Sequence, residues 1–179
     1  MAASTPTSKY PPLLLKYLKM FQDDPKSRIF APLAESYRKI GLIDQAIEIC
    51  QEGLSANPDF MGGKVALARA FYDKKMHVQV RETLMAVIDK IPDNLIAQRL
   101  LADSCLVLGY VHEALASYKM LLYFSPNDRE VAGLVQELET QAYERGGLLR
   151  VEQKPEKLRK LMRLQKLLTR VQQLRGVSV

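Results

Sequence analysis

Apolar residues recur along the chain at intervals of three and four, the period of an amphipathic helix. Between residues 29 and 54, two such runs lie on either side of Gly41: Ile29, Leu33, Tyr37 and Ile40 before it, and Ile43, Ile47, Cys50 and Leu54 after it. Glycine readily adopts the left-handed conformation that ends many helices. The pattern therefore predicts a helix, a tight turn and a second helix.

This helix-turn-helix pattern repeats with a fixed period. Pro58, Pro92 and Pro126 are 34 residues apart and stand in similar phrases, SANPDF, DKIPDN and YFSPND. The third unit has apolar runs around Gly109 as the first has around Gly41, whereas the second unit carries Lys75 in place of the glycine. Because such a period is typical of stacked helical repeats, we expect an all-α solenoid.

The sequence resembles the tetratricopeptide repeat (TPR) family over residues 27–126. Small-then-large residues in the first helix of each unit, turn glycines, small residues in the second helix and closing prolines carry the resemblance: Leu33, Ala34, Tyr37, Gly41, Ala46 and Pro58; Leu67, Ala68, Phe71 and Pro92; and Leu101, Ala102, Gly109, Ala114, Tyr118 and Pro126. The sequence departs from the pattern at Lys75, at Val80 and at Cys105, where an aromatic residue is usual. The resemblance implies a right-handed superhelical solenoid.

The repeats and their flanks divide the chain into segments. We expect TPR units at 27–60, 61–94 and 95–127. Before them, a partial repeat over 10–26 is expected to form one helix, and residues 1–9 are expected to be disordered. After them we expect a capping helix over 128–145, because such stacks need polar ends, then a linker over 146–155 and a helix over 156–175.

Composition bounds the class of protein. With 179 residues, 47% hydrophobic and 26% charged, the chain suits one folded unit, and its apolar runs are too short to cross a bilayer. Two cysteines are too few for a disulfide framework, and the polar N-terminal residues lack the apolar core of a secretory signal. We therefore expect a cytoplasmic protein.

Residues that commonly carry catalysis are sparse. The sequence has no phosphate-binding glycine loop, no nucleophile motif and no Cys and His cluster at metal-ligand spacing. His77 and His112 each stand alone near the start of a second helix, and Cys50 and Cys105 fall on apolar stripes, as small buried residues do. We predict no enzymatic activity, no cofactor, no metal site and no small-molecule substrate.

The TPR resemblance implies that the first helices of the units line a concave groove that binds proteins. On this chain the groove residues are expected to be Arg28, Arg38, Arg69, Tyr72, Ile96, Arg99, Leu100, Asp103 and Leu106. Arginine and tyrosine are frequent anchors of interfaces. The apolar residues of the third unit leave three interpretations open: contact with a partner, contact with the chain's own C-terminal helix, or contact of Leu106 and Val107 with the capping helix and no site.

Family members that bind chaperone C-termini hold the terminal carboxylate with lysine, arginine and asparagine side chains. The matching positions of this chain are Ala31, Glu35, Ala66, Ile96 and Leu100. These residues supply neither the charge nor the hydrogen-bond donors that a carboxylate needs. A chaperone-tail receptor of that kind is therefore not expected.

Positive charge is concentrated in the C-terminal segment. Between Arg145 and Arg175, ten Lys or Arg residues and two Glu leave a surplus of +8, so the rest of the chain carries −2 of the total of +6. The predicted C-terminal helix has an apolar seam and a basic side: Leu161, Leu164, Leu168 and Val171; Lys160 and Arg163. This helix is interpreted as solvated surface, as a site for a partner or a second copy, or as a site for acidic lipid or nucleic acid.

We predict a non-catalytic adaptor or scaffold that binds a partner protein in the groove. The alternative is a binder of anionic surfaces or nucleic acid through the basic C-terminal helix. The sequence also resembles small free-standing bacterial TPR proteins, which implies a small GTPase or another regulator of signalling, motility or cell polarity as partner. Self-association through the C-terminal helix is a further interpretation.

Overall fold

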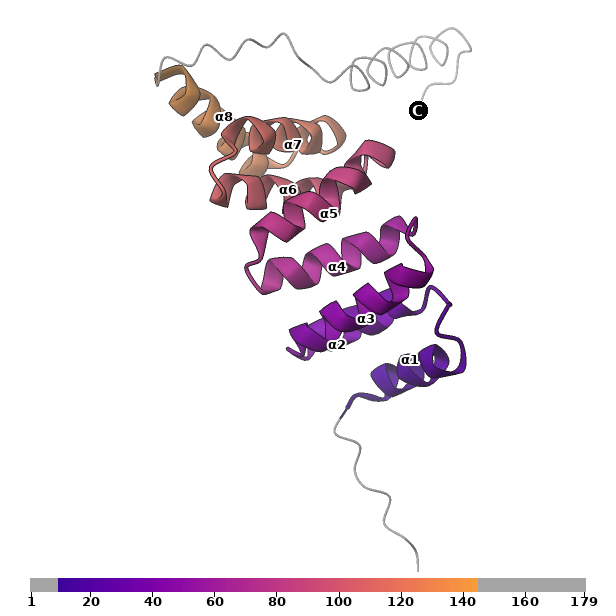
Figure 1. Cartoon of the computed structure of the whole chain (residues 1–179). Helices are drawn as coiled ribbons and strands as arrows, with labels where there is room; N and C mark the ends of the chain where they lie inside the picture. The colour runs from indigo at the N-terminus through magenta and orange to yellow at the C-terminus, as the bar shows by residue number, and fades with distance from the viewer. Residues whose placement is uncertain (1–9, 145–179) are drawn as a thin grey trace, which may run out of the picture. The chain divides into compact units, whose positions relative to one another are not determined.

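Eight α-helices and no strand make up residues 10–144, the part of the chain that the computed structural model describes. Figure 1 shows them as α1 (Pro12–Asp23), α2 (Phe30–Lys39), α3 (Ile43–Ala56), α4 (Met61–Asp73), α5 (His77–Lys90), α6 (Leu95–Val107), α7 (Val111–Phe124) and α8 (Arg129–Glu144). The all-α fold expected from the periodicity is confirmed.

The chain divides into two compact units, residues 1–138 and 139–179. Only the end of α8 is described in the second unit, and side chains are described as far as residue 140. The predicted disordered segment 1–9, linker 146–155 and basic helix 156–175 lie outside the described residues. No helix within 10–144 has the length and apolar content that a bilayer span requires.

Three helix pairs, α2 with α3, α4 with α5 and α6 with α7, pack against each other through tight turns. Each turn contains one residue in the left-handed region: Gly41 at φ +82°, Lys75 at +62° and Gly109 at +80°. The next backbone N–H donates to a carbonyl five residues back, at 3.0 Å from Leu42 to Tyr37 and at 2.9 Å from Met76 to Phe71. The glycine stops are confirmed, and Lys75 adopts the same conformation without being glycine.

The pairs stack in chain order. Each second helix contacts the first helix of the following pair, and the first helices α2, α4 and α6 also contact one another in sequence. The small residues that let helices approach closely are buried, as their pattern predicts: Ala34, Ala68, Ala102, Ala46 and Ala114. Val80, where the sequence departs from the pattern, is buried as well. We call the exposed side chains of α2, α4 and α6 the first-helix face.

A helix lies at each end of the three pairs. Helix α1 contacts α2, and Leu14 and Phe21 are its buried residues. Helix α8 begins at the last proline turn, where the Asp128 carboxylate accepts a hydrogen bond of 3.1 Å from the Val131 N–H. Val131 is fully buried, so α8 covers apolar surface at the end of the first unit.

Candidate functional site

The predicted groove residues lie on three neighbouring helices, with one exception. Arg38 is on α2, Arg69 and Tyr72 are on α4, and the residues from Ile96 to Leu106 are on α6. Arg28 precedes α2 and lies in a turn, where its guanidinium carbon is 5.1 Å from the centre of the Phe60 ring. The first-helix face therefore collects all of the predicted residues except Arg28.

The α2 end of this face is an ion-pair network. The Arg38 guanidinium donates two hydrogen bonds to Glu35, at 3.0 and 2.8 Å, and a third of 2.7 Å to Asp73 of α4. Arg69 of α4 lies 3.4 Å from the same Glu35 carboxylate. The hydrogen bonds from Arg38 and the charge of Arg69 hold the pKa of Glu35 below its ordinary value. Both arginines are thus already paired with acidic residues of this chain.

The α6 end is organised around Asp103. Its carboxylate accepts a hydrogen bond of 2.6 Å from the Tyr118 hydroxyl of α7 and one of 3.4 Å from the Tyr72 hydroxyl of α4. Arg99 lies 3.4 Å from Asp103 and also pairs with Glu130 of α8. Burial raises the pKa of Tyr118, which therefore remains a hydrogen-bond donor to Asp103. These bonds fix the polar side chains of α6 relative to its neighbours.

An apolar stripe along α6 is interrupted by Asp103, the centre of this polar network. Ile96, Leu100 and Val107 follow one another at i, i+4 and i+11, which places them on one side of the helix. Ile96 is 52% exposed and Val107 is 66% exposed, whereas Leu100 and Leu106 are half-buried. The described residues therefore do not bury Val107, and the stripe is open surface.

The sequence analysis named Asp103 as a groove residue, but it did not foresee that Asp73 of α4 and Glu130 of α8 pair with groove arginines. Arg38 and Asp73 are 35 residues apart, and Arg99 and Glu130 are 31 apart. Separations close to the repeat period of 34 place such residues on neighbouring repeats, as the Arg69 and Glu35 pair also shows. A search for opposite charges about one period apart would have found them.

The cysteines and histidines have structural surroundings. Cys50 and Cys105 are fully buried, and burial raises the pKa of the Cys50 thiol to about 12 and that of Cys105 to about 11. The His77 ring packs edge-on against Tyr72, and its Nδ1 lies 3.3 Å from the Ser104 hydroxyl. Within residues 10–144, no three His, Cys, Asp or Glu side chains are grouped to hold a metal ion.

Solved structures with this arrangement of helices identify the fold. The crystal structure of MamA superposes with a TM-score of 0.65 at 17% identity, covering 75% of this chain and 77% of MamA. The first TPR of Spaghetti (RPAP3) bound to the HSP90 peptide SRMEEVD gives 0.61 at 19% identity, with 68% and 96% covered. The solution structure of the first TPR domain of human RPAP3 gives 0.57 at 18% identity, with 67% and 94% covered. This chain has the TPR fold.

At these identities the similarity concerns the fold alone. No protein-family model and no curated protein sequence matches the chain. The TPR solenoid expected from the proline period and the small-then-large positions is confirmed. In this TPR fold the first-helix face presents fixed ion pairs at its α2 end and open apolar side chains at its α6 end.

Proposed function

We propose that this TPR protein is a non-catalytic adaptor that binds a segment of a partner protein on its first-helix face. The apolar stripe of Ile96, Leu100 and Val107 carries the proposal, since Ile96 and Val107 stay exposed while Asp103 between them is held in a fixed polar network. Exposed apolar patches of soluble proteins commonly mark interaction sites. The HSP90 peptide held by the similar RPAP3 domain supports a peptide-binding use of this fold.

The ion pairs determine which partner suits this face. Arg38, Arg69 and Arg99 each lie within 3.4 Å of a carboxylate of this chain, so an acidic partner would have to displace those bonds. An amphipathic helix that covers the α6 stripe with apolar side chains can bind without displacing these ion pairs. A surface helix of a small GTPase or of another signalling or motility regulator is a candidate of this chemistry.

Site-specific photo-crosslinking tests the proposal. A photoreactive phenylalanine analogue is placed at Ile96 on the stripe, or at Val78 of α5, which is similarly exposed (52% and 51%) but outside the first-helix face. We expect a discrete crosslinked partner from position 96 and none from position 78. Val107→Glu should weaken the crosslink from position 96. Equal crosslinking from both positions would contradict the proposal.

The concentration of charge between Arg145 and Arg175 favours a second candidate function, binding of anionic surfaces or nucleic acid. Phosphate-driven binding weakens steeply with salt, because bound counterions are released. We expect any binding to RNA or anionic vesicles to fall at least about tenfold between 50 and about 200 mM salt. Capture of the crosslinked partner should change little over the same range.

A further inference from the structure

We propose that the exposed face of α1 receives an amphipathic helix of a partner protein, with acidic residues on its flank, which completes the leading repeat of the stack. This surface is separate from the first-helix face. Figure 1 shows α1 beside α2 at one end of the stack, and within residues 10–144 no helix precedes it. Every other second helix packs against a first helix of its own repeat.

The repeat register identifies α1 as a second helix. Pro25 follows α1 as Pro58 follows α3, so each residue of α1 corresponds to the residue 33 positions later. In this register Leu14 corresponds to Ile47, and both are buried. Helix α1 contacts α2 as α3 contacts α4, the first helix of the next repeat.

The same register shows which surface of α1 the helices within residues 10–144 leave uncovered. Leu13 and Met20 correspond to Ala46, which is fully buried, and to Gly53. Gly53 faces the first helix of its own repeat, since a Cβ there would lie 2.1 Å from Cγ of Phe30. In α1 these positions carry large apolar side chains that are 55% and 43% exposed. The surface that packs on a first helix in α3 is therefore open in α1.

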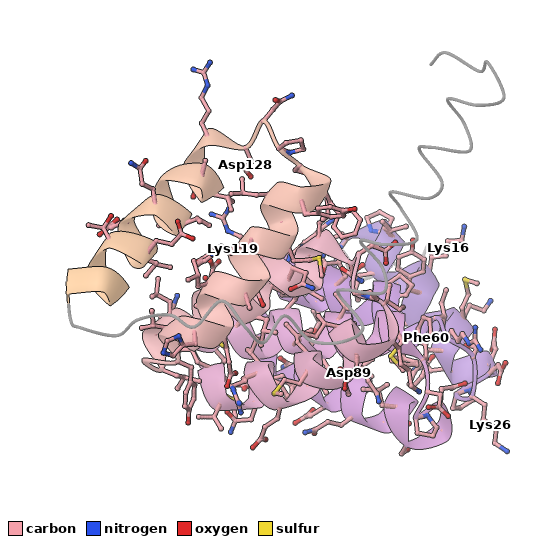
Figure 2. The ribbon with its side chains drawn as sticks, turned by 90° about the horizontal axis from the view of Figure 1, so that it is seen from above. Lys16, Lys26, Phe60, Asp89, Lys119 and Asp128 are labelled. Atoms are coloured by element: carbon pink, nitrogen blue, oxygen red, sulfur yellow. The ribbon has the colours of Figure 1, made fainter. Side chains whose placement is uncertain are left out.

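Two exposed lysines, Lys16 and Lys39, indicate the charge that the docked helix should carry. Lys16 stands between Leu13 and Met20 in the sequence, on the same side of α1, and its labelled side chain lies at the outline of the molecule in Figure 2. Lys39, at the end of α2, corresponds by the 34-residue period to Asp73, which binds Arg38 of the preceding first helix. The charge at this position is thus reversed, so the docked partner helix should carry an acidic residue at the position where α2 carries Arg38.

A second copy of this chain fits this surface poorly. Its α8 is the nearest equivalent of a first helix, but Gln136 stands in α8 where Ala102 stands in α6 and is exposed. The first helices need a small residue at this position to approach their second helix. Leu13 of α1 stands at the position that Ala46 has in α3, and its larger side chain leaves even less room for a large residue on the docked helix. A partner helix with a small residue at this position therefore fits better.

The test uses a probe built from this chain's own first helix. The probe is a labelled peptide of residues 61–74 with Tyr72→Glu, because Ala68 supplies the small residue and position 72 corresponds to Arg38. A matched peptide carries Tyr72→Lys. Binding to the full chain is followed by fluorescence anisotropy, and circular dichroism checks that each variant is folded.

We expect the acidic peptide to bind with a Kd between about 10 μM and about 1 mM, at least about tenfold tighter than the lysine peptide. Lys39→Glu should reverse this preference, and Leu13→Glu should abolish binding of both peptides. Val78→Glu places a charge at an equally open apolar position of α5 and should leave binding unchanged.

Four results would overturn the proposal. The first is that neither peptide binds with a Kd below about 1 mM, and the second is that Lys39→Glu does not reverse the preference between the peptides. The third is that Ile96→Glu abolishes peptide binding and Leu13→Glu does not. The fourth is that the free chain forms a dimer which Leu13→Glu dissociates. The third result would place the peptide on the first-helix face and leave the proposed function standing. The fourth would make a second copy the occupant.

Discussion

Phe30 of α2 fills the space in which a side chain at Gly53 of α3 would lie. A Cβ at Gly53 would be 2.1 Å from Cγ of the Phe30 ring, and one at Gly63 of α4 would be 2.5 Å from its Cζ. The ring is fully buried and packs edge-on against Phe60, with 5.7 Å between ring centres. Two glycines thus make room for one aromatic ring where three helices meet.

Gly53→Ala is expected to destabilise the protein by about 1–3 kcal/mol, because the added methyl group forces the buried ring to move. Gly133→Ala in α8 is the matched control, since a Cβ there meets nothing within 4 Å. On an open helix surface, replacing glycine with alanine is expected to raise the free energy of unfolding by up to about 1 kcal/mol. Urea unfolding measures both changes. Combining Gly53→Ala with Phe30→Leu should recover part of the loss, and equal effects of the two glycine variants would contradict this account.

Lys75 holds the left-handed conformation that glycine holds in the other two turns. The left-handed conformation is less stable by about 1–2 kcal/mol for residues with a Cβ. Lys75→Gly removes this strain but also removes a contact of the ammonium with the Tyr72 ring, 5.7 Å from its centre. We therefore expect a net gain of about 0.5–1 kcal/mol in the free energy of unfolding. Gly41→Ala should lose stability, although its Cβ would meet nothing within 4 Å. A loss of stability in Lys75→Gly would contradict the argument.

The helices were predictable from the sequence because each carries its own periodic signal. The stops at Gly41 and Gly109 were recognisable for the same local reason. Lys75 shows the limit of that reasoning, since the tertiary packing of α4 on α5 imposes a backbone conformation that the residue itself disfavours.

The candidate site was only partly predictable. That Ile96 and Leu100 lie on one side of α6 follows from helical spacing. The pairing of Arg38 with Asp73 depends on side chains 35 residues apart, and no pattern within one helix reveals it. The match of Phe30 with Gly53 and Gly63 likewise becomes visible only when neighbouring repeats are compared.

Glu35 should make the stability of the protein depend on acid pH. Its pKa is held below the ordinary 4.5 by hydrogen bonds from Arg38 and the charge of Arg69. A carboxyl with a lowered pKa stabilises the fold above its ordinary pKa and loses this effect as the pH falls through its value in the folded protein. Glu35→Gln should therefore cost about 1–2 kcal/mol at neutral pH and much less near pH 3. Denaturant midpoints of the variant and the parent protein at the two pH values test this. Glu48→Gln, at an exposed position of α3, is the control. A constant difference would contradict the prediction.

Both cysteines should be unreactive in the folded protein. Thiolates are the reactive form, and burial raises the pKa of Cys50 to about 12 and of Cys105 to about 11. Alkylation by iodoacetamide at neutral pH should therefore be slow in buffer and fast for both residues in guanidinium chloride. Mass spectrometry of the labelled peptides separates the two sites. Rapid labelling of either residue without denaturant would show that its surroundings open on the time scale of the reaction.

The HSP90 peptide SRMEEVD, which the similar RPAP3 domain holds, should not bind the first-helix face of this protein with a Kd below about 1 mM. The positions that match a carboxylate clamp are Ala31, Glu35, Ala66, Ile96 and Leu100. Glu35 would repel the acidic peptide. Arg38 and Arg69 already bind the Glu35 carboxylate, so they are not free to bind the peptide. Isothermal titration calorimetry of the peptide into this protein tests the expectation, with the RPAP3 domain as positive control. Micromolar binding that Ile96→Glu abolishes would show that ion pairs such as Arg38 with Glu35 rearrange for an acidic ligand, and would turn the proposed partner from an amphipathic helix to an acidic tail.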